Sequence, residues 1–322
     1  MMSSPVNEIT APALRMAYEN GDAAELLAGP DVLALVAFGG TGLPDDPRAL
    51  RVGLAPLGAS PFEVWRASGP VESGRDGELA WSSDGEHAFF AIEVEETAHG
   101  GIAQAAAHAY RRVLDHVASS PTPYLLRLWN YFDAINLGEG DDERYRRFCE
   151  GRARALASGM RYPAATAIGR RDGVRTLQVY GLAARSAGTP VENPRQVSAW
   201  RYPRAYGPAA PSFARGLRTG ECLLISGTAA VVGHASHHPG DLAAQLDETL
   251  ANLDSLAAVA GFTRRFAGGS VLKAYVRHAA DAAAVAAMLR QRLPALDGLV
   301  LLEGDICRRE LLVEIDGMVH AP

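Results

Sequence analysis

Residues 241–260 read DLAAQLDETLANLDSLAAVA, and residues 270–277 read SVLKAYVR. In the first segment the leucines recur at helical spacing, namely Leu242, Leu246, Leu250, Leu253 and Leu256. Asp241 is a suitable N-cap and Gly261 a suitable stop, so the pattern predicts a helix between them. The second segment is rich in β-branched and aromatic residues, which predicts a strand.

The flanking sequence extends this order to helix, strand, helix, strand, strand. Asp281 is placed to cap a second helix that runs to about Leu293. Four apolar runs predict the other strands of the same sheet: Ser212–Arg215, Cys222–Ser226, Leu299–Leu302 and Leu311–Ile315.

The middle of the chain repeats this order about 140 residues earlier. A helical stripe from Ile102 to Val117 and a second helix from Asp142 to about Leu156 are predicted. The predicted strands are Leu79–Trp81, Ala88–Val94, Tyr124–Phe132 and Thr176–Ala183. The first sixty residues carry less of the pattern, with one predicted helix and two strands at Ala13–Leu27, Val32–Phe38 and Arg51–Leu57.

The repeated order predicts three modules in the 322 residues, joined at Pro- and Gly-rich segments near Leu57–Pro61 and Gly188–Pro208. They are an incomplete N-terminal module (1–61), a central module (62–187) and a C-terminal module (188–322). The predicted fold class is α/β, in the α+β sense, with mixed sheets and helices packed on one face.

Composition excludes several classes of protein. Apolar residues make up 48% and charged residues 21%, which is typical of a soluble globular chain. A net charge of -6 without a basic cluster disfavours nucleic-acid binding. No apolar run is long enough to cross a membrane and the start does not resemble a signal peptide, so a cytoplasmic location is expected. Three widely spaced cysteines predict free thiols.

A set of short motifs in a fixed order resembles the chorismatase family of the RidA/YjgF superfamily, from about residue 60 to the C-terminus. The motifs are Pro70–Gly74, Trp129–Tyr131, Phe148–Ala153, Pro163–Thr166, Glu192–Pro194, Tyr206–Pro208, Leu223–Gly227, Leu272–Val276 and Glu314–Met318. The resemblance implies RidA-like modules in a pseudo-threefold single chain, with an active site between the central and C-terminal modules. It implies loss of pyruvate from chorismate without a cofactor. It also implies a monomer, since a pseudo-trimer already buries the surfaces that RidA subunits use to associate.

Glu314 lies in the apolar run Leu311–Ile315, where two interpretations compete. A strand glutamate between Val313 and Ile315 is ordinarily on the solvent face. Cleavage of an enol ether instead begins with protonation of the methylene carbon, and burial keeps a carboxyl protonated for that task. The resemblance implies that Glu314 is the catalytic acid.

Gly227 and Cys307 bear on the product. The pair resembles the 3-hydroxybenzoate-forming subtype, whereas the subtype that stops at the dihydroxycyclohexadiene carboxylate tends to have alanine at both places. A missing methyl group at residue 227 leaves room for attack by the ring's own 4-hydroxyl in place of water, and Cys307 would assist ring opening or proton removal. Core filler is the alternative role for Cys307. Release of the diene, or of 4-hydroxybenzoate as well, remains open.

Chorismate is a dianion, and arginine suits carboxylates. The candidates for substrate binding are Arg152, Arg215, Lys273 with Arg277 on the same predicted strand, and Tyr206. For each cation the alternative is a solvated surface charge, and for Tyr206 it is packing in a turn. The run His234–Asp241 suggests metal, but Pro239 to Asp241 read as a turn and helix cap, so no metal site is predicted.

Imine hydrolysis of the RidA type relies on an arginine that Leu299–Leu302 lacks, which argues against it. A RidA-like protein that binds a small molecule without turnover is the alternative outside the enzymes.

Overall fold

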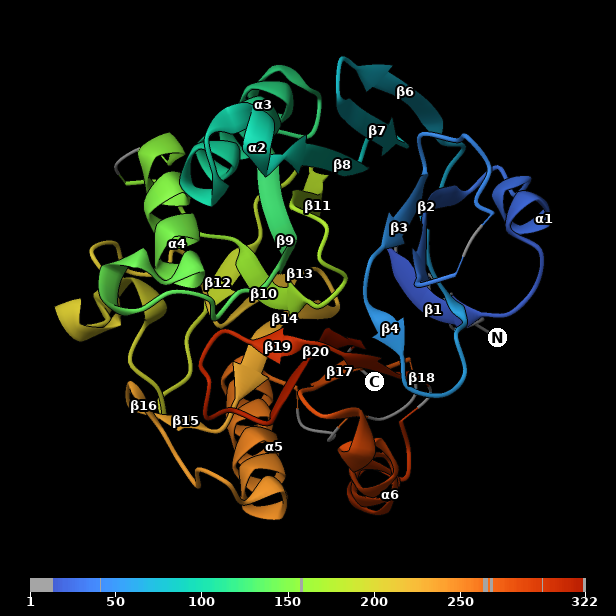
Figure 1. The fold of residues 1–322 in the computed structure, drawn as a ribbon. Coiled ribbons are helices and arrows are strands. Elements are labelled where there is room, and N and C mark those ends of the chain that lie inside the picture. The colour runs from blue at the N-terminus through green and yellow to red at the C-terminus, as the bar shows by residue number, and fades with distance from the viewer. Residues whose placement is uncertain are drawn as a thin grey trace, which may run out of the picture.

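The computed structural model describes residues 14–40, 42–156, 159–262, 266, 269–296 and 298–320. They form three sheets whose inner faces meet around a shared core, with the longer helices on the outside (Figure 1). Among the described helices, none combines the length and apolar character needed to cross a membrane.

The N-terminal sheet has four strands and one short helix, α1 (Ala23–Leu27). Its strand order is β1 (Arg15–Glu19), β5 (Phe62–Arg66), β2 (Val32–Phe38) and β3 (Ala49–Val52). The sequence predicted a helix over Ala13–Leu27, which is wrong for Arg15–Glu19, whereas Ala13 lies outside the described residues. Those five residues pair antiparallel with β5, and the helix begins only after Asp22, whose side chain caps it.

The central sheet has seven strands, covered by α2 (Glu96–His99), α3 (Ile102–Ser119) and α4 (Arg144–Ala155). Its order is β19 (Asp305–Ile306), β10 (Ala164–Arg170), β9 (Tyr124–Asp133), β11 (Thr176–Ala184), β8 (His87–Glu95), β7 (Leu79–Ser83) and β6 (Glu72–Asp76). The sequence missed β10, whose alanines and glycine have low β-propensity.

The C-terminal sheet also has seven strands, covered by α5 (Leu242–Val259) and α6 (Ala282–Arg292). Its order is β12 (Thr189–Val191), β13 (Gly216–Thr219), β14 (Cys222–Ala229), β20 (Val313–His320), β17 (Val271–Val276), β18 (Gly298–Glu303) and β4 (Ala55–Pro56). A small hairpin of β15 (Val231–Val232) and β16 (Ala235–Ser236) follows β14. The predicted strand Ser212–Arg215 is wrong, because the tight turn at Gly220 pairs Gly216–Thr219 with β14.

The two seven-stranded sheets share one pattern of pairing. β9 is parallel to β10 and antiparallel to β11, as β17 is parallel to β18 and antiparallel to β20. Each takes its last edge strand from elsewhere in the chain, because β19 pairs with β10 and β4 pairs with β18. The mixed sheets with helices on their outer faces confirm the predicted fold class.

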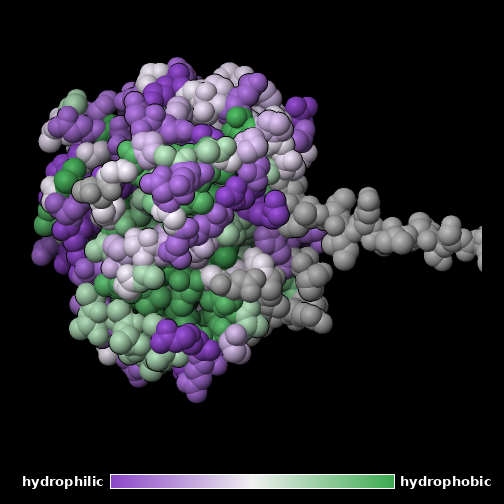
Figure 2. All heavy atoms as spheres, turned by 90° about the vertical axis from the view of Figure 1, so that its right-hand side faces the viewer, coloured by the Kyte–Doolittle hydropathy of each residue, from purple (hydrophilic) through white to green (hydrophobic). Residues whose placement is uncertain are grey.

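Apolar residues from all three sheets form the inner core, including Phe38, Trp129 and Tyr275. Figure 2 looks onto the side of the molecule that carries the N-terminal sheet and shows apolar surface gathered in its lower half. That level of the molecule holds α6, whose exposed positions include Ala283, Ala284 and Ala287.

Candidate active site

A cavity of about 400 Å³ opens where the central and C-terminal sheets meet. Hydrogen bonds join the two sheets at its floor, since Ser226 Oγ accepts from the backbone of Ala165 at 2.9 Å. The cavity brings together six of the site residues predicted from the sequence: Glu314, Cys307, Gly227, Arg152, Arg215 and Tyr206.

Glu314 lies on β20 and points inward. Its neighbours Val313 and Ile315 pack into the core beneath α5, so the alternation of a strand turns Glu314 to the opposite face. The side chain is 5% exposed and lines the cavity. Burial, helped by the nearby charge of Asp316, raises the pKa of Glu314 to about 8. The carboxyl therefore carries its proton at neutral pH and is free to donate it.

Gly227 lies on β14, directly against the Glu314 carboxyl. The register between β14 and β20 is irregular between Ile225 and Thr228, which places Gly227 in a bulge. A Cβ atom at Gly227 would lie 2.0 Å from Oε1 of Glu314 and 3.3 Å from Oγ1 of Thr166. Only a residue without a side chain leaves room for the acid in this position.

Cys307 follows β19 and is half-buried on the cavity wall. Burial, followed by the proximity of Glu314, raises the pKa of the Cys307 thiol well above its ordinary value. The residue is a neutral thiol at physiological pH, so a thiolate that removes protons is disfavoured. The geometry fits better with a side chain that shapes the cavity wall, which is close to the alternative role of core filler.

Two buried arginines face the cavity without a carboxylate partner in the described part of the chain. Arg152 on α4 is 2% exposed, packs over the rings of Phe148 and Tyr110, and donates to Cys149 Sγ at 3.8 Å. Arg215 is 5% exposed and donates to the Val197 carbonyl and the Tyr202 hydroxyl. The Nε atom of each is unpaired. Glu192 lies near Arg215 and accepts from its backbone N–H, but neither guanidinium forms an ion pair with a carboxylate of the described residues. A buried cation without an ion-pair partner is costly, and an anionic ligand would relieve that cost.

Tyr206 lies at the mouth of the cavity beside residues that the sequence did not single out. Its hydroxyl is 3.2 Å from His234 Nδ1, and the Arg308 guanidinium stacks 4.2 Å from its ring centre. Arg308 also lines the cavity, as do Gln196 and Thr166. The sequence offers a signal for two of these residues. Arg308 directly follows Cys307, and Thr166 is the last residue of one of the motifs.

The interpretation of Lys273 as a substrate-binding residue needs correction, because Lys273 lies outside the cavity. Its ammonium group is fully buried in the inner core, 2.6 Å from Glu63 Oε2 and 3.0 Å from the Tyr180 hydroxyl. The group also lies 4.7 Å from the centre of the Trp129 ring. Its charge is already neutralised by Glu63, so it is not an anion-binding residue for this site.

The side chains of the histidine run make contacts within the protein. Ligand-type atoms of His237, His238 and Glu248 lie within 4.8 Å of one another. Glu248, however, already pairs with the Arg195 guanidinium and with His238. A guanidinium beside the carboxylate disfavours a second cation there, so we assign no metal to this cluster.

Comparison with known proteins gives consistent matches. A family model described as chorismatase FkbO/Hyg5-like, N-terminal, matches residues 63–183. A chorismatase of Streptomyces hygroscopicus is 38% identical over 273 residues, which is 80% of this chain and 78% of the relative. A 3-hydroxybenzoate synthase of the same organism is 35% identical over 292 residues, 84% of this chain and 85% of the relative. A crystal structure of a chorismatase has a TM-score of 0.85 at 34% identity, covering 97% of this chain and all of that one.

Proposed function

The chain belongs to the chorismatase family, and on that premise we propose that it converts chorismate to 3-hydroxybenzoate and pyruvate. One observation carries the proposal: the protonated carboxyl of Glu314 shares a cavity with the cations of Arg152 and Arg215, each of which keeps an unpaired Nε–H. An acid beside two anion-binding groups suits a substrate that has two carboxylates and an acid-labile enol ether.

Arg152 and Arg215 bind the two carboxylates in this proposal. Each guanidinium has an unused Nε–H, so it can donate to an anion without breaking an existing contact. Charge-assisted hydrogen bonds of this kind are about twice as strong as neutral ones. The phenol of Tyr206 at the mouth of the cavity offers a further donor to a carboxylate.

Glu314 supplies the proton. Transfer to the methylene carbon of the enolpyruvyl group converts the enol ether to an oxocarbenium ion, which is then captured by an oxygen nucleophile. Loss of pyruvate follows. Chorismate has the same atoms as 3-hydroxybenzoate plus pyruvate, so this route consumes no water. The proton given to the methylene is balanced by the one that the ring loses as it becomes aromatic.

The choice of product depends on which oxygen captures the cation. Capture by the ring's 4-hydroxyl forms a cyclic ketal; loss of the proton at ring carbon 3 with cleavage of the C4–O bond then makes the ring aromatic, and the remaining hemiketal breaks down to 3-hydroxybenzoate and pyruvate. Capture by water gives a hemiketal that breaks down to the diene and pyruvate. We assign the first route because of the missing methyl group at Gly227 and the neutral thiol of Cys307 on the cavity wall. The relative named 3-hydroxybenzoate synthase supports this choice. Diene release and a mixture with 4-hydroxybenzoate are the alternative outcomes.

The test is to incubate the purified protein with chorismate and to follow pyruvate, with chromatography of the aromatic products. Pyruvate together with 3-hydroxybenzoate is the expected result. Diene as the sole product would overturn the assignment of Gly227 and Cys307. Binding of chorismate without any pyruvate would favour a RidA-like binding protein.

We also propose that the chain is a monomer built of modules 1–61, 62–187 and 188–322. The shared pairing pattern of the two seven-stranded sheets and the common inner core support this organisation, in which β5, at the start of the second segment, completes the N-terminal sheet of the first. Light scattering on a sizing column tests it, and a mass of about one chain of 34.1 kDa is expected.

A further inference from the structure

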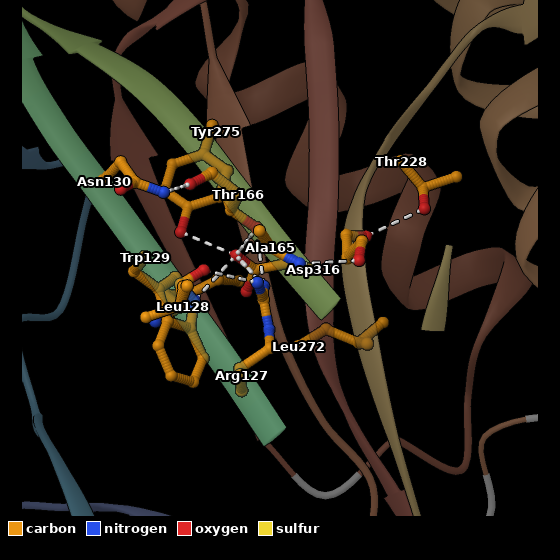
Figure 3. A network of polar contacts seen from close by, with 12 residues as sticks. Arg127, Leu128, Trp129, Asn130, Ala165, Thr166, Thr228, Leu272, Tyr275 and Asp316 are labelled. Atoms are coloured by element: carbon orange, nitrogen blue, oxygen red, sulfur yellow. Dashed lines mark hydrogen bonds and ion pairs between the residues drawn. The ribbon is translucent and has the colours of Figure 1, made fainter. Parts of the chain in front are cut away.

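Asp316 lies two residues after Glu314 on β20, so both carboxyl groups are on the same face of the strand. Asp316 is fully buried, and one of its oxygens, Oδ2, receives four donors (Figure 3). They are Thr166 Oγ1 at 2.8 Å, Tyr275 OH at 2.9 Å, Trp129 Nε1 at 3.0 Å and Arg127 Nη2 at 3.0 Å. All four groups are donors, so this oxygen of Asp316 acts only as an acceptor.

Arg127 supplies the counter-charge without leaving the network. Its guanidinium is fully buried, stacks 4.3 Å from the centre of the Trp129 ring, and donates to the Leu128 carbonyl. It also donates to Thr166 Oγ1 at 2.5 Å. The other carboxylate oxygen, Asp316 Oδ1, is buried without a partner among the described residues. Arg127 Nε is likewise buried without a partner among the described residues, so the pair keeps one free acceptor and one free donor.

Thr166 connects this network to the cavity. Its hydroxyl donates to Asp316 and accepts from Arg127, so the hydroxyl proton points toward Asp316. The same hydroxyl oxygen lies 3.3 Å from the Cβ position of Gly227, and Oε1 of Glu314 lies 2.0 Å from that position. Next to the acid, Thr166 therefore offers a lone pair and no donor. A carboxyl that keeps its proton fits beside it, whereas a carboxylate would find no hydrogen bond there.

We propose that Asp316 is a positioning residue for the acid: it binds the hydroxyl proton of Thr166 and places a negative charge beside the cavity, with Arg127 as its counter-charge, and so keeps Glu314 protonated and turned toward the substrate. This inference rests on the proposed function, because it concerns the same acid. Nothing in it requires Asp316 to touch the substrate, and Asp316 does not line the cavity.

Some of the charges around Glu314 raise its pKa and others lower it. After burial, Asp316 is the largest cause that raises the pKa of Glu314, whereas Arg127, Arg215 and Arg277 lower it. The thiol of Cys307 also faces Glu314 from the loop after β19. Removing only the charge of Asp316 leaves the three arginines in place, so the pKa of Glu314 must fall.

The experiment measures the pH dependence of kcat/KM for chorismate in the wild type and in Asp316→Asn. The upper limb reports loss of the proton from the free enzyme's acid and is expected near pH 8 in the wild type. In Asp316→Asn the limb should move down by about one pH unit, with about tenfold lower kcat/KM above it. A double variant, Asp316→Asn with Arg127→Gln, removes both charges and avoids a buried unpaired cation, so it folds more readily. The upper limb of its pH profile should also move to lower pH, but by less than in Asp316→Asn.

Tyr275→Phe is the matched control, because it removes one donor to Asp316 Oδ2 and keeps both charges. We expect it to lower the melting temperature and to leave the upper limb in place. Equal loss of kcat in all three variants with an unmoved limb would mean that Asp316 is only structural and would overturn the inference. Failure of the wild type to release pyruvate would instead overturn the proposed function.

Discussion

The Cβ position of Gly227 lies 2.0 Å from Oε1 and 2.9 Å from Cδ of Glu314. Real Cβ atoms do not approach other heavy atoms so closely, so the carboxyl fills the space that any other residue at 227 would take. The position of the acid is therefore coupled to a single missing methyl group on the neighbouring strand. The sequence suggested that this methyl group affects room beside the substrate, whereas the geometry shows that it first meets the acid.

Gly227→Ala should displace the Glu314 carboxyl and lower kcat by about 100-fold, since a shift of about 1 Å in a catalytic group has that effect. The product should shift toward the diene, because the added methyl group also takes room beside the ring. Chromatography of the products and initial rates of pyruvate release measure both effects. Cys307→Ala is the control, as it leaves the acid unobstructed and should keep kcat within a few-fold. Wild-type rate and products in Gly227→Ala would contradict the coupling.

Replacement of the acid itself, Glu314→Gln, should lower kcat by roughly 100- to 10,000-fold. In heavy water the wild type should release pyruvate with one deuterium in its methyl group, because the acid delivers its proton to the methylene carbon. Mass spectrometry of early product reads the label. Glu310→Gln is the matched control, since Glu310 lines the same cavity but is exposed. Near-normal turnover in Glu314→Gln would remove the assigned role.

The raised pKa of Glu314 also predicts how stability depends on pH. The carboxyl has an ordinary pKa of 4.5 and one of about 8 in the folded chain, so the folded state holds the proton more tightly. Between these values the unfolded chain is ionised at this position, and stability falls as pH rises, by about 3 kcal/mol at pH 7. Glu314→Gln removes this penalty. Its melting temperature should exceed that of the wild type more at pH 8 than at pH 5, and a difference independent of pH would contradict the assignment.

The fold was predictable where the chain has strong periodicity. The helices α3, α5 and α6 and the strand β2 lie within a few residues of their predicted bounds, because amphipathic spacing and caps determine them locally. The wrong predictions are at segments whose structure depends on the strands beside them. Arg15–Glu19 becomes a strand because β5 lies beside it, and β10 forms between two strands despite its small residues. Neither contact is visible in the local sequence.

For the site, the sequence identified the groups that reach the cavity but not what surrounds them. Arg152 and Lys273 are both buried cations, and only tertiary packing distinguishes Arg152, which has no carboxylate partner, from Lys273, which pairs with Glu63. The network of Arg127 and Asp316 escaped notice for the same reason. These residues lie 189 positions apart in the sequence (316 − 127), and their side chains meet only when the two sheets meet.

Arg152 is expected to contribute to binding rather than to proton transfer. Arg152→Met removes the unpaired cation and keeps much of the packing over Phe148. A lost charge-assisted hydrogen bond of about 1.5–3 kcal/mol corresponds to a KM about 10- to 100-fold higher. The control is Arg154→Met on the same helix, where the cation is half-exposed and already pairs with Glu150. Steady-state kinetics with chorismate distinguish the two, and an unchanged KM in Arg152→Met would exclude this arginine from the carboxylate site.

Lys273 should affect stability and not catalysis. Lys273→Met leaves Glu63 as a buried, unpaired carboxylate and should destabilise the fold by about 3–5 kcal/mol. The double variant Lys273→Met with Glu63→Leu removes both charges and should regain most of that loss, since an apolar pair can replace a buried ion pair. Urea unfolding measures the free energies, and kinetics below the unfolding transition give the KM for chorismate, which should stay at the wild-type value. A raised KM in a double variant of wild-type stability would mean that Lys273 does reach the substrate.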